Sequence, residues 1–130
     1  MTISVHMTLN IKIKGEINMK REKIDNIIKE FVEKGRDCID LKTSNDSLFL
    51  QSGVIVNYYT IIGIKLSKDI VILNKDKYSV TTSKNQNKIR RLCQDMNIKV
   101  IEVPENGINR VASSYHDGKD TNYLLELLAM

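Results

Sequence analysis

The sequence predicts an α+β fold: an antiparallel sheet of about six strands, with two amphipathic helices on one face and a short C-terminal helix. Strand-forming segments separated by short turns fill the middle of the chain, and a strict alternation of apolar and polar residues precedes them. Two other segments repeat their apolar residues at helical spacing. The chain has 130 residues and one proline, without a repeat or linker, so we expect a single domain over residues 1–130.

The first two predicted elements are a strand and a helix. Residues 3–13 alternate apolar and polar side chains without a break, as in a half-buried strand, and Gly15 ends this pattern. Apolar residues then recur at helical spacing within residues 19–34. Asn18 suits the N-cap of this helix, and Gly35 suits the left-handed residue at its C-terminal end.

From residue 37 to residue 81 the chain is rich in strand formers. Its longest apolar segment is apolar on both faces, which predicts a central strand. The connections are only a few residues long, whereas a parallel crossover needs about a dozen or more, so we expect an antiparallel meander. The strands are predicted at residues 37–42, 47–51, 54–66, 70–73 and 78–80.

A second helix and a further strand follow. Ser83 and Gln86 have the S-x-x-Q spacing of a capping box, which predicts a helix over residues 83–96. Apolar residues at helical spacing give this helix one buried stripe. Residues 98–103 then form a strand, which Pro104 stops.

The C-terminal segment bears on the oligomeric state. Residues 105–119 are expected to form a loop, and Asp120 is expected to cap a terminal helix. That helix carries more apolar side chains than one buried stripe requires, while two other helices already occupy the sheet. It either closes the protein's own core or packs against a second copy, and we predict a homodimer. The expected interface residues are Leu124, Leu125, Leu128 and Met130.

Positive charge is concentrated between residues 65 and 91, where eight basic and two acidic residues give a net charge of +6. On a helical wheel Lys84, Lys88 and Arg91 form one line. This line starts at a helix N-terminus, where unpaired N–H groups attract anions. The block is either a surface that contacts phosphates or a partner, or an ordinary solvated face. For the first case the binding residues are Lys75, Lys77, Thr81, Thr82, Ser83, Lys84, Lys88, Arg90 and Arg91.

Two short motifs are compatible with nucleic-acid chemistry. Tyr58 and Tyr59 could stack on bases, but adjacent strand residues face opposite ways, so we expect at least one of them in the core. Asp40-Leu41-Lys42 matches the D-x-K fragment of metal-dependent nucleases, which also need a further carboxylate near the metal. Two of the three candidates for this role point away from the apolar stripe of their helix. The candidates are Asp25, Glu30 and Glu33.

The remaining reactive residues predict neither a catalytic site nor a metal or cofactor site. His116 and Asp117 are adjacent, and adjacent residues rarely reach each other as an acid–base pair. Asp117-Gly118 fits a turn instead. Cys38 and Cys93 each lie in an apolar segment far from both histidines, as buried thiols in a reducing compartment do. We therefore predict no catalytic residue, no metal ligand and no cofactor.

The sequence also predicts a cytoplasmic protein. No apolar run approaches the roughly 18–20 residues that span a bilayer. The first residues lack the basic segment and the continuous apolar core of a signal peptide. We expect no membrane partner.

The stretch Asn57-Tyr58-Tyr59-Thr60-Ile61-Ile62 is followed by Tyr78-Ser79-Val80-Thr81-Thr82-Ser83-Lys84-Asn85-Gln86. Together they resemble a pattern in small uncharacterised phage proteins, a Y-x-T-x-[IV] strand and then Y-S-x-T-T-x-[KR]-H leading into a helix. The resemblance covers residues 54–96, and Asn85 stands where that pattern usually has histidine, so any role of that histidine does not carry over. The resemblance implies a phage or mobile-element origin and no particular activity. The abundance of Ile, Lys and Asn, which have AT-rich codons, agrees with a low-GC bacterium or one of its phages.

From these observations we expect a non-enzymatic phage or mobile-element accessory protein, anti-CRISPR-like, that binds and inhibits a host nucleic-acid-handling machine. Its partner would be a host protein or a ribonucleoprotein effector. The basic block argues against a DNA mimic, which presents an acidic surface. The alternative is a direct DNA- or RNA-binding protein that uses residues 65–91, and a small metal-dependent nuclease is a third hypothesis.

Overall fold

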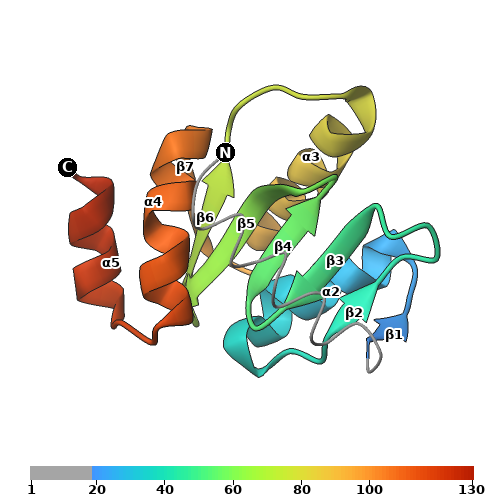
Figure 1. The fold of residues 1–130 in the computed structure, drawn as a ribbon, viewed down its shortest axis with the longest axis horizontal. Helices are drawn as coiled ribbons and strands as arrows, with labels where there is room; N and C mark the ends of the chain where they lie inside the picture. Colours follow the sequence, from blue (N-terminus) through green and yellow to red (C-terminus); the bar gives the residue numbers. More distant parts are fainter. Residues whose placement is uncertain (1–18) are drawn as a thin grey trace.

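The fold is one mixed sheet with helices on both faces (Figure 1). The computed structural model describes residues 19–130, and the strand predicted at residues 3–13 lies outside them. Neighbouring strands follow one another across the sheet in chain order. The strands are β1 (Lys20–Arg21), β2 (Leu41–Lys42), β3 (Leu48–Gln51), β4 (Val54–Asn57), β5 (Thr60–Ser67), β6 (Ile70–Asn74) and β7 (Lys99–Val103). The helices are α2 (Ile24–Lys34), the 3-10 helix η2 (Gly35–Asp37), α3 (Val80–Asp95), α4 (Glu105–His116) and α5 (Thr121–Leu128).

Strands β2 to β6 form the antiparallel meander that the short turns predict. The two outer pairs, β1 with β2 and β6 with β7, are parallel. The prediction of a wholly antiparallel sheet was therefore wrong at both edges. Each parallel pair is joined through a helix, α2 or α3, which supplies the length that a crossover needs. The α+β class is confirmed, with seven strands among residues 19–130 instead of about six.

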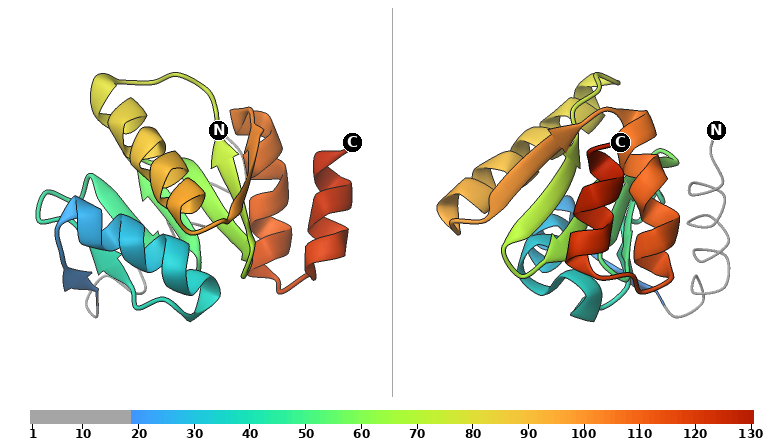
Figure 2. Two further views of the ribbon diagram at one scale, coloured as in Figure 1. Left: turned by 180° about the vertical axis from the view of Figure 1, so that it is seen from behind. Right: turned by 90° about the vertical axis from the view of Figure 1, so that its left-hand side faces the viewer.

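The helices lie on opposite faces of the sheet (Figure 2). α2 and α3 lie side by side on one face, as their amphipathic stripes predict, and bury Ile27, Phe31 and Ile89 there. α4 and α5 pack on the other face, where Ile108 and Tyr115 are buried. Each face of the sheet thus has its own hydrophobic core.

The helix α4 lies where the sequence analysis placed a loop. Ile108, Val111, Ala112 and Tyr115 recur at helical spacing, and all four are buried. That spacing is the signal by which the helix could have been found. Gly107 precedes this stripe and polar residues lie within it, and burial of the stripe outweighs their weak helix propensity.

The segment 54–66, predicted as one strand, is the hairpin of β4 and β5. Tyr58 and Tyr59 form its turn with φ angles of 48° and 65°, and Asn57 pairs with Thr60 across it. Positive φ at both central residues matches a type I′ turn, which usually takes Asn-Gly, so the sequence lacks the usual signal. Both tyrosines are exposed, at 53% and 60%, and the prediction that one would lie in the core was wrong.

α2 is shorter than predicted. Lys20 and Arg21 pair with β2 as a strand, so the helix begins only at Ile24. Gly35 follows the last residue of the helix with a φ of 55° and a ψ of −124°, so the predicted positive φ is present but the left-handed helical conformation is not. The predicted N-cap, Asn18, lies outside the described residues.

α3 begins at Val80, earlier than predicted. Ser79 is its N-cap, and the Ser79 Oγ accepts a hydrogen bond from the backbone N–H of Thr82 at 3.3 Å. Ser83 therefore lies within the first turn and is not the cap. The strand predicted at residues 78–80 is not formed, because these residues lead into the helix.

We expect Ser79→Ala to lower the free energy of unfolding by about 0.5–2 kcal/mol, because it removes the cap of α3. Ser83→Ala, in the same turn, should change it little. Urea denaturation followed by far-UV circular dichroism measures both variants. Equal losses in the two variants would contradict the assignment of Ser79 as the cap.

The terminal helix α5 packs on its own domain. Asp120 caps it through its side chain, as predicted. Leu124 is fully buried, so its assignment to a dimer interface was wrong; Leu125 and Leu128 also pack against this core but are only partly buried. The two amphipathic helices α2 and α3 cover only one face of the sheet. The other face is therefore open to α5, which packs there beside α4. Met130 is 82% exposed, and the homodimer stays a prediction.

Candidate functional site

Three helices begin at the same end of the sheet. Strands β1, β6 and β7 run in one direction, and α2, α3 and α4 follow their carboxyl ends. The turns 43–47 and 58–59 of the meander lie at this end too. We call it the crossover end; in Figure 1 it carries the arrowhead of β6 and the start of α3. In open sheets with helical crossovers, ligands bind beyond the carboxyl ends of the strands.

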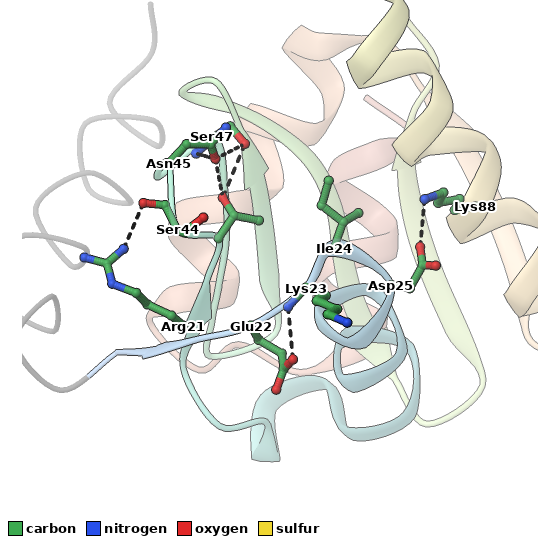
Figure 3. Close-up of a pocket in the computed structure, with 10 residues that line it drawn as sticks. Arg21, Glu22, Lys23, Ile24, Asp25, Ser44, Asn45, Ser47 and Lys88 are labelled. Carbon is green, nitrogen blue, oxygen red and sulfur yellow. Dashed lines mark hydrogen bonds and ion pairs between the residues drawn. The ribbon is translucent and has the colours of Figure 1, made fainter.

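The first hollow of the crossover end has a volume of about 610 Å³ and lies between the start of α2 and the turn 43–47 (Figure 3). Arg21 Nη1 donates to the main-chain oxygen of Ser44 at 3.0 Å. Lys88 reaches in from α3, and its Nζ lies 2.7 Å from Asp25 Oδ1. The two basic side chains of this hollow, Arg21 and Lys88, are thus already bonded to groups of the protein itself.

The second hollow of the crossover end, which we call the hairpin pocket, has a volume of about 480 Å³. It lies between the β4–β5 turn and the segment that leads into α3. Its lining combines two tyrosine rings, one amide and four side chains with hydroxyl groups. They are Asn57, Tyr58, Thr60, Tyr78, Ser79, Thr81 and Thr82. The fold therefore brings together the two stretches that the sequence singled out.

A buried polar network fixes the hairpin pocket to the sheet. Asn85 Nδ2 donates to Asn57 Oδ1 at 3.1 Å, and Asn57 Nδ2 donates to the main-chain oxygen of Ser47 at 2.7 Å. Gln86 does not close a capping box: its Nε2 donates to the main-chain oxygen of Asn74 at 2.6 Å. All four amide side chains are at most 3% exposed. The sequence analysis missed these amides, because a polar residue carries no local signal of burial. Breaking one of these buried hydrogen bonds costs about 1–3 kcal/mol.

Tyr78 connects the hairpin pocket to α4. Its Oη donates to Glu105 Oε1 and accepts from Asn74 Nδ2, both at 2.9 Å. Burial, together with the nearby Glu105 carboxylate, raises the pKa of Tyr78 to about 12. The phenol is thus held in its neutral, donating form.

We expect stability to fall between about pH 10 and pH 12, because the unfolded chain loses the Tyr78 proton near its ordinary pKa of 10.0 whereas the folded chain keeps it to about 12. In this window the folded state binds more protons, so rising pH favours unfolding. Tyr78→Phe should remove this part of the loss and one late step in the phenolate absorbance. Burial raises the pKa of Tyr115 as well, so a late step from that residue remains.

Spectrophotometric titration and denaturation at several pH values check this prediction. Tyr123→Phe, on the exposed side of α5, is the matched control and should leave the Tyr78 step in place. Loss of a step near pH 10 in Tyr78→Phe, with every late step kept, would contradict the raised pKa of Tyr78.

Two of the basic residues predicted to bind a partner are paired within the protein. Lys88 is bonded to Asp25, and Arg90 Nη2 lies 2.8 Å from Glu102 Oε1. The hydrogen bond from Arg90 lowers the pKa of Glu102. Their positive charges are therefore partly neutralised.

The other predicted binding residues lie before α3 or along it, and four of them are exposed cations. These are Lys75, Lys77, Lys84 and Arg91. Thr81 is exposed, Ser83 is half-buried and Thr82 is buried. Lys65, counted in the basic block, is not part of this surface, because its Nζ donates to the main-chain oxygen of Val32 and burial lowers its pKa. The block 65–91 is thus less positive at the surface than its composition indicates.

The carboxylates that a metal-dependent nuclease needs are not gathered in the described part of the chain. Asp40 accepts from Gln51 Nε2 at 3.2 Å, and Lys42 Nζ lies 3.2 Å from Asp46 Oδ1. Glu30 accepts from a backbone N–H at 2.9 Å. Among residues 19–130, no group of three or more His, Cys, Asp and Glu side chains could hold a metal ion.

His116 lies at the surface, whereas the two thiols are wholly or partly buried. His116 is exposed in the last turn of α4, and Gly118 has a φ of 85°, which confirms the turn predicted there. Cys93 is buried and Cys38 is half-buried. Burial raises the pKa of both thiols, to about 11 for Cys93, so both are protonated at neutral pH.

Comparisons with protein-family models, with curated proteins and with solved structures found no match for this chain. None of the helices within residues 19–130 is long and apolar enough to cross a membrane. The molecule is therefore placed by its fold and its crossover end: an α+β domain whose hairpin pocket is lined by aromatic, amide and hydroxyl groups.

Proposed function

We propose that this chain is a non-enzymatic accessory protein of a phage or mobile element that binds and inhibits a nucleic-acid-handling machine of its host. A CRISPR effector is the type of target that we expect, and the cytoplasm of a bacterium is where binding takes place. The resemblance of residues 57–62 and 78–86 to small phage proteins supports this origin. The hairpin pocket supports it further, because its lining comes from these two stretches alone.

The observation that carries the proposal is the exposed aromatic surface at the crossover end. Tyr58, Tyr59, Tyr78 and Val80 are four of the eight large hydrophobic side chains exposed among residues 19–130. Tyrosine is enriched at interfaces, where it supplies contact area at a small cost in conformational entropy. The two turn tyrosines also occupy the left-handed region, which is unfavourable for bulky residues and marks functional sites.

The charges near this surface suit a protein or ribonucleoprotein partner. Lys88 and Arg90 are bonded to acidic side chains, so the outer face of α3 presents both signs of charge. Lys84 and Arg91 are exposed and attract acidic groups of a partner during encounter. A mixed surface of this kind is typical of the rim of a protein interface.

Direct binding of DNA or RNA is the second candidate function. The exposed cations Lys75, Lys77 and Lys84, close in sequence to residues of the hairpin pocket, favour it. Binding through phosphates would weaken steeply as salt rises, because each contact releases counterions. An inhibitor directed at a protein would instead bind its effector much more tightly than it binds naked nucleic acid.

Affinity capture from a lysate of a low-GC bacterium, with and without nuclease treatment, tests the proposal. The variant without the proposed contact is the double substitution Tyr58→Asn, Tyr59→Gly. It should keep the hairpin, because Asn-Gly is the preferred type I′ turn. We expect the wild type to retain a nucleic-acid-handling complex after nuclease treatment and to reduce its purified activity, and the variant to do neither.

Three results would contradict the proposal. Capture that disappears with nuclease treatment would favour direct nucleic-acid binding. Equal capture by the double variant would exclude the turn tyrosines as the contact. Cleavage of DNA or RNA by the purified protein, dependent on Mg²⁺ or Mn²⁺, would favour the nuclease hypothesis.

A further inference from the structure

We propose that the hairpin pocket binds one nucleotide, with its base against Tyr58 and its phosphate toward Lys84. This inference rests on the proposed function, since a nucleic-acid-handling machine offers unpaired nucleotides, and it names the ligand of the same site. A free mononucleotide and an unpaired nucleotide within a single strand share this chemistry.

The lining of the pocket matches the parts of a nucleotide. Tyr58 and Tyr78 supply aromatic rings, and every base has a flat face that stacks on such a ring. Thr60 and Thr81 supply hydroxyl groups that bond sugar or phosphate oxygens. The volume of about 480 Å³ lies within the range of small-molecule sites.

Buried and hydrogen-bonded side chains hold the shape of the hairpin pocket. Two of its polar side chains, Asn57 and Thr82, are only 1% and 2% exposed. Asn57 is held from both sides, by the main chain of Ser47 and by Asn85 of α3. A site fixed in this way loses little freedom when a ligand binds.

The charge beside the pocket suits a phosphate. Thr81 lines the pocket, and Lys84 follows three residues later, which places both on one face of α3. Lys84 is exposed, as is Lys77 just before the pocket residue Tyr78. Of the carboxylates near Tyr78, Glu105 is bonded to its hydroxyl on the side of α4, and Asp76 accepts from the backbone N–H of Glu105. Cations therefore lie beside Thr81 and before Tyr78, where a phosphate can approach.

A duplex fits this site less well than an unpaired nucleotide. Stacking on Tyr58 requires a base whose face is free, and bases in a duplex are covered by their neighbours. The tyrosine stands in a two-residue turn and is 53% exposed. We expect single strands to bind more tightly than duplexes of the same length.

Fluorescence anisotropy with labelled single-stranded dT12 and rU12, and with a 12-base-pair duplex, tests this inference; chemical-shift titration with UMP and TMP forms the mononucleotide arm. We expect Tyr58→Asn to weaken binding about 5- to 100-fold, the range for one stacked base, without loss of fold. Asparagine tolerates the positive φ of this position, so the variant stays folded. Tyr123→Asn, an exposed tyrosine on α5, is the matched control and should bind as the wild type does.

The phosphate contact has its own pair of variants. Lys84→Gln should weaken single-strand binding about tenfold and reduce its salt dependence, whereas Lys68→Gln, in the β5–β6 turn at the opposite end of the sheet, should not. Binding of the strands without the mononucleotides identifies a strand-borne ligand, and binding of both identifies a nucleotide as such; either outcome supports the inference.

The inference is overturned if neither strands nor mononucleotides bind, if Tyr58→Asn binds as tightly as the wild type, or if the duplex binds best. Capture of a nuclease-resistant host complex together with any of these results would leave the proposed function standing and remove only the nucleotide. Nucleotide binding without any captured complex would remove the proposed function and keep the site.

Discussion

Gly53→Ala is expected to destabilise the protein by about 2–5 kcal/mol. Gly53 has a φ of 84°, where an L side chain costs about 1–2 kcal/mol. A Cβ at this position would overlap the Tyr115 hydroxyl and lie 3.1 Å from the backbone nitrogen of Arg36. The Tyr115 hydroxyl would be displaced from the main-chain oxygen of Lys65, a buried bond of 2.7 Å whose loss costs about 1–3 kcal/mol.

This change acts on one of the contacts between α4 and the sheet. The Arg36 guanidinium lies 3.6 Å from the centroid of the Tyr115 ring and donates to the Tyr115 main-chain oxygen at 2.7 Å. Displacement of the tyrosine therefore disturbs η2 and α4 together. Because small domains are stable by only about 5–15 kcal/mol, a large share of the total stability is at stake.

Chemical denaturation of Gly53→Ala and Gly118→Ala measures this effect. Gly118 also has a positive φ, of 85°, but a Cβ there meets nothing within 4 Å, so this control isolates the backbone cost. Gly53→Ala should lose clearly more than its control. If both variants lose the same amount, the close approach of Tyr115 is not what makes glycine necessary at position 53.

The triple charge reversal Lys84→Glu, Lys88→Glu and Arg91→Glu is expected to weaken partner or polyanion binding about 100-fold or more. Each lost contact of roughly 1 kcal/mol contributes a factor of about 5, and the new negative charges repel an acidic partner in addition. The fold should persist, because only the exposed pair of Lys88 with Asp25 is broken, which costs at most about 1 kcal/mol.

A second triple charge reversal serves as the control. It has the same net charge as the first triple variant, but its three substitutions lie elsewhere on the surface. Lys68→Glu, Lys99→Glu and Lys119→Glu all lie away from the crossover end, in the β5–β6 turn, at the start of β7 and after α4. Binding by this control should weaken by a few-fold at most, while thermal melting followed by circular dichroism verifies both folds. Equal weakening in the two triple variants would indicate a general charge effect and no site on α3.

Features of the fold that depend on near neighbours in the chain could be predicted from the sequence. Short connections force the β2–β6 meander, because they leave no length for a crossover. The apolar stripes of α2 and α3, the cap Asp120 and the turn at Gly118 likewise depend on residues within a few positions. These local rules were enough for the α+β class and for two helices on one face.

Features that depend on packing between distant residues were missed. α4 forms because its stripe of Ile108, Val111, Ala112 and Tyr115 is buried on the second face of the sheet, which local propensity does not reveal. The turn at Tyr58 and Tyr59 lacks the usual Asn-Gly, so its geometry is imposed by the pairing of β4 with β5 on either side.

The sequence by itself predicted candidate binding residues among the hydroxyls and cations of residues 75–91, and it placed at least one of Tyr58 and Tyr59 in the core. Only the tertiary structure decided which of them can meet a ligand. Asn57 and Asn85 are 28 positions apart yet bonded, and Lys88 is bonded to Asp25 across 63 positions. The physical reason is that burial and charge pairing are set by whichever residues the folded chain brings within a few ångströms, and sequence spacing reports only on neighbours along one helix or strand.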